Sequence, residues 1–460
     1  MLENTVFKQS RVASFRFKLR GLVFFSFSAE ALIAGFYIAV TRSITPILLI
    51  ASGYRLEDIL LVNGFAGLFS LIIGLLLYKY GSRRISKLKL LMVHVLERAM
   101  WFAIPFMVGD RFLLTLVYGL AVASTLPTSI YMQTAILSSF SGVEYRRVVS
   151  VRSGLAAFSS ILGHVFVVLT LATLTGQGKY LGLYETAFGI GVLSSVIIAL
   201  TPKNAFKNSV TMVRNGGFEA EAKATNTYIL LVAILSSYML LNMAWTPRIM
   251  YDLKAPDYIA ASIGFAQTAA AIGSSFFWAN RSSRTYRYAL IMLTSMPLLV
   301  YITLEPRFHI ALALMYGFSI VGVNLYAARM YSGLVGEIGV FRAGLLLAST
   351  GSFALTLASI IGYTVSAASS MVFLASAILG IAGLTIALTG FPEFAIIPKN
   401  YVQLYSKIMY QTSISSYNLA AYAISESAKT SLRIIGLSIT LILLFIIYRT
   451  LYYITIITGG

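Results

Sequence analysis

Two charged residues, Glu30 and Arg42, lie inside the first long apolar run of this sequence, residues 21–50. A charge at the centre of a membrane costs at least about 2.5–3.5 kcal/mol, so each residue is a candidate functional group. A carboxyl near the midplane could take up and release a proton as its access to water alternates. A guanidinium in such a place could bind a carboxylate or a phosphate. We therefore predict proton coupling at Glu30 and solute binding at Arg42. The alternatives are a hydrogen-bonded structural Glu30 and an Arg42 that reaches the lipid headgroups.

Further polar side chains lie in apolar runs, several of them around Pro247. A proline inside a helix frees a backbone carbonyl, which could bind solute or water. Uncharged polar groups in other runs could add contacts, although hydrogen bonds between helices explain them equally well. The additional substrate-binding side chains that we predict are Asn242, Trp245, Arg248, Gln133 and Asn324.

A third group, His94, Glu97 and Arg98, lies in the run 87–108. His94 shares a helical face with both other residues, because the spacings are three and four. We predict a structural network here, with a proton relay as the alternative.

The composition shows what must position these residues. Of 460 residues, 58% are hydrophobic and only 11% are charged, far beyond the needs of a soluble core. The chain has no cysteine and three histidines, which excludes thiol chemistry and argues against a metal site built by the protein. Hydrolases and transferases need clustered nucleophiles, metal ligands or acids, and the sequence lacks such clusters. We therefore expect a polytopic membrane protein that is not an enzyme and binds no cofactor.

Apolar runs of about 20 residues recur along the whole chain, and each is long enough to span a bilayer as a helix. They are too long for the strands of a barrel and lack sustained alternation. We predict an all-α protein with thirteen spans: 21–50, 56–78, 87–108, 112–139, 149–174, 182–201, 227–251, 257–279, 288–304, 308–331, 341–366, 371–392 and 434–456.

The positive charges predict the orientation. The net charge is +19, and 26 Lys and Arg residues fall in one alternate set of connections against 7 in the other. Short cytoplasmic loops retain Lys and Arg, so the N-terminus is predicted inside and the C-terminus outside. This orientation also explains the basic composition without nucleic acid. The predicted parts are an N-terminal six-helix half (1–201), a cytoplasmic linker (202–226), a C-terminal half (227–392), a cytoplasmic amphipathic linker (393–433) and an extra transmembrane segment (434–460).

The two halves contain weak internal repeats. At offsets of about 200 residues, the tripeptide Gly-Phe-Ala recurs at 64–66 and 264–266, and Pro46 recurs as Pro247. The basic loops that follow the second helix of each half also match. Matches in equivalent places predict two parallel six-helix repeats, an arrangement found in secondary transporters.

The loop after the second helix carries a family resemblance. Its pattern, Gly74-x3-Tyr78-Lys79-x-Gly81-Ser82-Arg83-Arg84, resembles the signature G-x3-D-R-x-G-R-R of the major facilitator superfamily, and Asn280-Arg281-Ser282-Ser283-Arg284 is similar to a degenerate second copy. The family's loop Asp is replaced by Tyr78 and Asn280. The resemblance covers about residues 20–392 and implies a bundle of twelve helices, to which the predicted thirteenth is extra. It also implies that these loops gate the inner side, through Lys79, Gly81, Arg83, Arg84, Arg281 and Arg284.

Together these features predict a secondary active transporter in the cytoplasmic (plasma) membrane. It would move a small anionic or zwitterionic solute by alternating access, as a symporter coupled to protons or another ion. The alternatives are a flippase for lipid-linked oligosaccharides and a non-transporting, transporter-like subunit of a membrane complex. Membrane lipids are expected partners, and the C-terminal extension would suit a protein partner.

Overall fold

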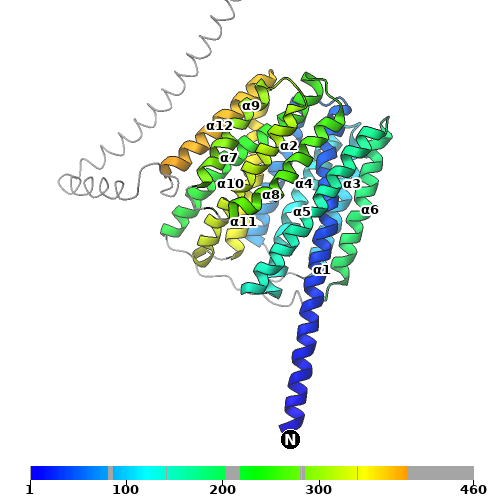
Figure 1. Cartoon of the computed structure of the whole chain (residues 1–460), viewed down its shortest axis with the longest axis vertical. Helices are drawn as coiled ribbons and strands as arrows, with labels where there is room; N and C mark the ends of the chain where they lie inside the picture. Colours follow the sequence, from blue (N-terminus) through cyan, green and yellow to red (C-terminus); the bar gives the residue numbers. More distant parts are fainter. Residues whose placement is uncertain are drawn as a thin grey trace, which may run out of the picture. The chain divides into compact units, whose positions relative to one another are not determined.

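The computed structural model describes residues 2–80, 86–140, 142–202, 218–279, 281, 285–338 and 340–390. Within these ranges it contains helices and no strand (Figure 1). The six helices of the N-terminal half are α1 (Leu2–Ala51), α2 (Leu56–Tyr80), α3 (Lys87–Met107), α4 (Arg111–Ser139), α5 (Gly142–Thr173) and α6 (Gly178–Leu200). Those of the C-terminal half are α7 (Phe218–Pro247) with the π-helix η2 (Arg248–Asp252), α8 (Asp257–Ala279), α9 (Tyr286–Ile302), α10 (Phe308–Ile338), α11 (Val340–Thr364) and α12 (Ser369–Gly390).

The predicted all-α fold is confirmed, with twelve of the predicted helices observed among the described residues. Ten stretches are long and apolar enough to cross a membrane, and α9 is a shorter apolar helix. The predicted linker 393–433 and the predicted thirteenth helix, 434–456, lie outside the described residues.

Three helices begin at least seven residues earlier than predicted. α1 starts at Leu2, α5 at Gly142 and α7 at Phe218, so the last nine residues of the predicted linker 202–226 are helical. The nine additional residues of α7 are rich in Ala, Glu and Lys, which have high helix propensity. Glu and Lys are charged, so these residues do not extend the apolar run. Apolarity therefore located the spans but not the polar ends of these helices.

The proline in the first span does not interrupt it. α1 continues through Pro46 to Ala51. In α7, by contrast, the α-helix ends at Pro247 and a π-helix follows. Loss of the proline N–H changes the hydrogen-bond ladder at that point.

Helices pack within each half and across the two halves. α1 packs on α5 and α6 and α7 on α11 and α12, while α2–α11 and α5–α8 are the main contacts between halves. Gly67 of α2 lies so close to α11 that a Cβ there would be 2.8 Å from the backbone nitrogen of Thr356. Small residues thus let the two halves approach closely.

A histidine bridges the halves midway along α5. His164 Nδ1 lies 2.8 Å from the Ser43 hydroxyl of α1, and its Nε2 lies 2.9 Å from the Thr268 hydroxyl of α8. Both ring nitrogens are therefore used within the interface.

Polar contacts also join the halves where α1 ends and α8 begins, which we call the far end. The opposite end, where α2 ends and α3 begins, we call the basic end. At the far end, Lys179 Nζ lies 2.5 Å from Asp257 Oδ2, and the Tyr180 hydroxyl donates to the same carboxylate at 3.0 Å. The Tyr251 hydroxyl lies 2.9 Å from the carbonyl oxygen of Ile50. An ion pair and hydrogen bonds therefore join the two halves at the far end.

Candidate functional site

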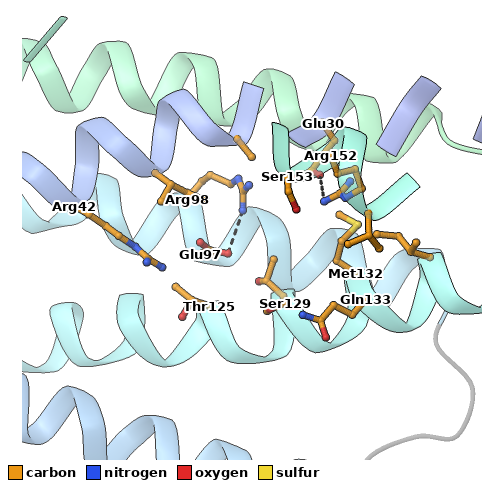
Figure 2. Close-up of a pocket in the computed structure, with 15 residues that line it drawn as sticks. Glu30, Arg42, Glu97, Arg98, Thr125, Ser129, Met132, Gln133, Arg152 and Ser153 are labelled. Carbon is orange, nitrogen blue, oxygen red and sulfur yellow. Dashed lines mark hydrogen bonds and ion pairs between the residues drawn. The ribbon is translucent and has the colours of Figure 1, made fainter. Parts of the chain in front are cut away.

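A cavity of about 530 Å³ lies inside the N-terminal half and runs toward the basic end (Figure 2). Cavities of this size accommodate small-molecule solutes. Residues of α1, α3, α4 and α5 form its walls: Glu30, Ala34, Ile38, Arg42, Glu97, Arg98, Thr125, Thr128, Ser129, Met132, Gln133, Ile136, Val149, Arg152 and Ser153.

Helical spacing explains how α1 contributes both predicted charges. Its four lining residues, Glu30, Ala34, Ile38 and Arg42, recur at every fourth position. Each such step turns the side chain by about 40° and rises about 6 Å, so the stripe winds slowly along the helix. Figure 2 shows Arg42 toward one end of the cavity and Glu30 toward the other. Both therefore face one cavity, although they are too far apart to pair.

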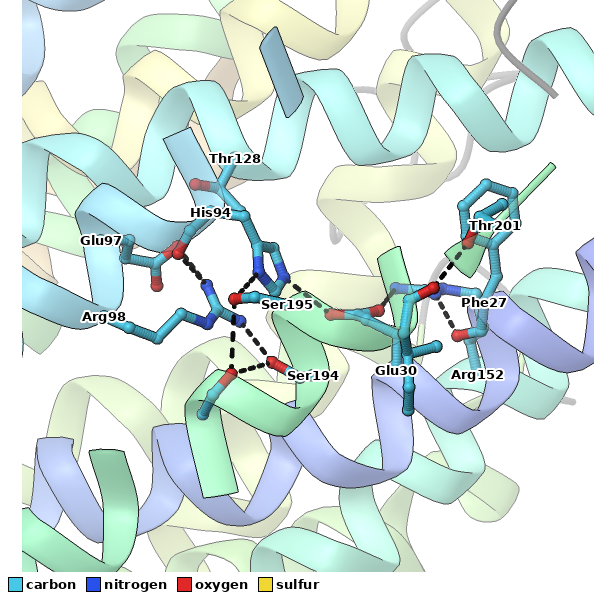
Figure 3. Close-up of polar contacts among 12 residues, drawn as sticks. Phe27, Glu30, His94, Glu97, Arg98, Thr128, Arg152, Ser194, Ser195 and Thr201 are labelled. Atoms are coloured by element: carbon cyan, nitrogen blue, oxygen red, sulfur yellow. Dashed lines mark hydrogen bonds and ion pairs between the residues drawn. The ribbon is translucent and has the colours of Figure 1, made fainter. Parts of the chain in front are cut away.

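Glu30 is buried between two partners from other helices (Figure 3). Its Oε2 lies 2.9 Å from Arg152 Nη2 of α5, and its Oε1 lies 3.3 Å from His94 Nε2 of α3. His94 Nδ1 in turn lies 2.8 Å from the Ser195 hydroxyl of α6. An ionised carboxylate only accepts hydrogen bonds, so it requires the proton on His94 Nε2, and Ser195 then donates to Nδ1. Arg152 also donates to the carbonyl oxygen of Phe27.

A second ion pair lies between Arg42 and Glu30 along the cavity. Arg98 Nη1 donates to Glu97 Oε2 at 3.2 Å, and its Nη2 donates to the Ser194 hydroxyl at 3.2 Å. The guanidinium also lies over the ring of Tyr37, with its central carbon 5.0 Å from the ring centroid. Such partners offset the cost of burying the arginine charge. The Nε of Arg98 and the hydroxyl of Tyr37 are buried without a hydrogen-bond partner.

The wall opposite α1 is α4, and it is hydroxylated. The Thr125 hydroxyl donates to the carbonyl oxygen of Val122 at 2.7 Å, and the Thr128 hydroxyl donates to that of Ser124 at 2.8 Å. Each oxygen keeps its lone pairs free to accept a further hydrogen bond. Ser129 and Gln133 lie on the same wall, so α4 offers several uncharged contacts.

Three of the predicted residues come together in this cavity: Glu30, Arg42 and Gln133. Asn324, on α10, is exposed and does not line it. The prediction of a purely local network at His94, Glu97 and Arg98 was incomplete. α3 packs only on α4 and α6 to any extent, but its charged side chains reach Glu30 and the cavity.

The residues predicted around Pro247 do not line the cavity either. Trp245 is fully buried, and its indole N–H donates to His309 Nδ1 at 3.0 Å. Arg248 donates to Asp252 at 3.0 Å and to the carbonyl oxygen of Tyr301 at 3.1 Å. Asn242 interacts with the hydroxyls of two tyrosines, Tyr238 and Tyr316. These side chains are therefore bound within the C-terminal half.

The gating loops at the basic end are only partly described. Gly81, Arg83, Arg84 and Arg284 lie outside the described residues. Lys79 is exposed in the last turn of α2. The guanidinium carbon of Arg281 lies 4.2 Å from the ring centroid of Phe277.

Arg152 is the important lining residue that sequence reasoning missed. It lies only three residues into the predicted span 149–174, and it was counted with the basic residues of the connection before that span. With α5 starting at Gly142, Arg152 lies ten residues, about 15 Å, inside the helix. A signal for that start was present, because Ser141 and Glu144 have the spacing of a helix capping box. A partner for Glu30 could therefore have been found.

Comparison with known proteins shows the fold. No protein-family model and no curated protein matches the chain. Two crystal structures of the nucleoside transporter NupG, one of them a mutant, align over 80% of this chain with 14% identity and a TM-score of 0.56, covering 98–99% of their own chains. A mutant of the E. coli fucose:proton symporter FucP aligns over 78% of this chain and 97% of its own, with 14% identity and a TM-score of 0.50. Both proteins are major facilitator superfamily transporters, so the resemblance predicted from the loop after the second helix is confirmed at the level of the fold: this chain has the fold of the major facilitator superfamily.

Proposed function

We propose that this protein is a secondary transporter that moves a small anionic solute across the cytoplasmic membrane by alternating access, coupled to protons through Glu30. One observation carries the proposal: a buried carboxylate, Glu30, is ion-paired to Arg152 at the wall of a solute-sized cavity. The similarity in fold to a nucleoside transporter and to a fucose:proton symporter supports the same class of activity.

The Glu30–Arg152 pair provides a route to coupling. Protonation of Glu30 removes the negative charge that holds the Arg152 guanidinium at 2.9 Å. The Arg152 charge is then uncompensated and adds to the positive charge of the cavity, which makes proton binding and the binding of an anionic solute mutually favourable. His94, whose Nε2 lies 3.3 Å from the same carboxylate, donates a hydrogen bond to Glu30 while Glu30 is ionised.

The arrangement of the two ends supports alternating access. The far end is held by the Lys179–Asp257 ion pair and by Tyr251, both across the halves. The cavity reaches toward the basic end, where Ile136 lies three residues from the end of α4. With the basic end on the cytoplasmic side, as the Lys and Arg distribution predicts, this is the conformation closed to the outside.

The test is transport by the purified full chain in liposomes. The solute is first selected by thermal shift from organic acids, phosphorylated sugars, neutral sugars, amino acids and peptides, since ligand binding to the native state raises apparent stability. Glu30→Gln should retain exchange of that solute and lose uphill accumulation driven by a pH gradient. Glu185→Gln, which changes an exposed acid on α6, is the control. Undiminished accumulation by Glu30→Gln would contradict the coupling role.

A further inference from the structure

The charges of the cavity wall do not balance. Glu30 pairs with Arg152 at 2.9 Å and Glu97 pairs with Arg98 at 3.2 Å. Arg42 is exposed, and no ion pair with it occurs among the described residues. The cavity thus holds three guanidinium groups against two carboxylates, which leaves one positive charge for a solute to neutralise. A solute with one negative charge matches it.

The opposite wall indicates what else the solute carries. The hydroxyls of Thr125 and Thr128 donate to carbonyl oxygens of their own helix. Toward the cavity, these hydroxyl oxygens can therefore only accept hydrogen bonds. Gln133, one turn beyond Ser129, adds an amide that both donates and accepts. Such a wall best satisfies a ligand with several O–H groups along its length.

The cavity wall also disfavours ring systems that stack. Among its fifteen described lining residues, none is Phe, Tyr or Trp. Stacking on an aromatic side chain contributes about 1–3 kcal/mol for each nucleic-acid base, and a nucleobase would lack that contribution here. This wall therefore fits an aliphatic, hydroxylated ligand better than a nucleoside.

We infer that the solute is a hydroxylated monocarboxylate of the sugar-acid type, with its carboxylate on Arg42 and its hydroxyls along α4. The inference rests on the proposed transport function and names the substrate class of that same cavity. A six-carbon acid is well within a volume of about 530 Å³.

Isothermal titration of the full chain in detergent tests the class with four probes that separate its features. D-gluconate has the charge and the hydroxyls, D-glucose lacks the charge, hexanoate lacks the hydroxyls, and uridine carries an aromatic base. Gluconate should bind at least about tenfold more tightly than each of the others. D-glucose and uridine lose a charge-assisted contact worth about 1.5–3 kcal/mol, and hexanoate loses several neutral hydrogen bonds worth about 0.5–1.5 kcal/mol each.

Two variants locate the contacts. Arg42→Gln should weaken gluconate binding by about tenfold or more and leave the weak glucose binding unchanged. Its control is Arg307→Gln, at an exposed position of the far end, which should change the binding of neither ligand. Thr128→Val should weaken gluconate by about three- to tenfold and leave hexanoate unchanged. Its matched control is Thr186→Val, because Thr186 makes the same bond to its own helix on the exposed face of α6.

Failure of this inference is separable from failure of the proposed function. Equal affinity for hexanoate and gluconate, tighter binding of uridine, or no gluconate binding would overturn the substrate class, while exchange of another solute in liposomes would still support transport. Gluconate binding that depends on Arg42, without gluconate exchange in liposomes, would support the substrate class and overturn the transport function.

Discussion

The first helices of the two halves, α1 and α7, carry different kinds of residue at equivalent positions. At the repeat offset of 201 residues that relates Pro46 to Pro247, the charged residues Glu30 and Arg42 of α1 correspond to Leu231 and Met243 of α7. Glu30 and Arg42 line the cavity, whereas Leu231 and Met243 are buried in the apolar core. The repeat has kept the helix and its proline but not its chemistry, so the charges of the cavity come from the N-terminal half.

The polar groups of the C-terminal half bind one another instead. The indole of Trp245 donates to His309 Nδ1, so the proton of the neutral His309 ring lies on Nε2, which is 3.1 Å from the carbonyl oxygen of Thr303. The rings of Tyr238 and Tyr316 stack with centroids 5.4 Å apart. These polar groups of the C-terminal half are therefore paired with one another.

The largest effect should come from breaking the buried pair of the N-terminal half. Arg152→Ala leaves Glu30 buried with only His94 as a partner at 3.3 Å. Removal of one member of a buried ion pair typically costs about 3–5 kcal/mol, because the other charge remains uncompensated. We expect a correspondingly large loss of thermal stability in detergent.

A second substitution decides whether charge is the cause. Addition of Glu30→Gln to Arg152→Ala removes the stranded carboxylate and should recover more than half of the lost stability. If the double variant is as unstable as Arg152→Ala alone, the arginine stabilises the protein by packing rather than by pairing, and the contrast between the halves weakens.

The sequence predicted some of the residues that make the two halves different, but not all of them. Glu30 and Arg42 stood out because charge inside an apolar run is costly. Arg152 did not, because it lies only three residues into the predicted span 149–174 and was counted with the Lys and Arg residues of the adjoining connection. Trp245 and Arg248 looked equivalent to cavity residues, but whether a polar side chain faces a cavity or a neighbouring helix depends on the rotation of its helix. That rotation is set by packing between residues far apart in sequence, such as Trp245 and His309.

A smaller effect is expected from the neutral network of the C-terminal half. Trp245→Phe keeps an aromatic ring in the core but removes the donor to His309 Nδ1. A buried acceptor left unsatisfied costs about 1–3 kcal/mol. We expect reduced thermal stability together with an unchanged affinity for gluconate. A loss of affinity as large as that of Arg42→Gln would show that the C-terminal half recognises the solute too.

The smallest effect on stability should come from the far end, where a bond between the halves can be compared with a bond inside one half. Lys179 pairs with Asp257 across the halves, whereas Arg111 of α4 pairs with Asp58 of α2 at 3.1 Å within the N-terminal half. Arg111→Met should cost about 1 kcal/mol or less, because the Arg111 side chain is largely exposed. Lys179→Met should cost about 1 kcal/mol or more, because the Lys179 side chain is only 12% exposed, although Tyr180 still donates to Asp257.

Their effects on conformation should differ. The chain has no cysteine, so a single Ala261→Cys, at a buried position one turn below Asp257, reports opening of the far end through its rate of maleimide labelling. A loss of 1 kcal/mol from the closed state alone raises the open population about fivefold. Lys179→Met should therefore label at least about fivefold faster, and Arg111→Met at the unchanged rate. Equal rates in both variants would mean that the cross-half ion pair does not hold the far end closed, which would leave α2–α11 and α5–α8 packing to do so.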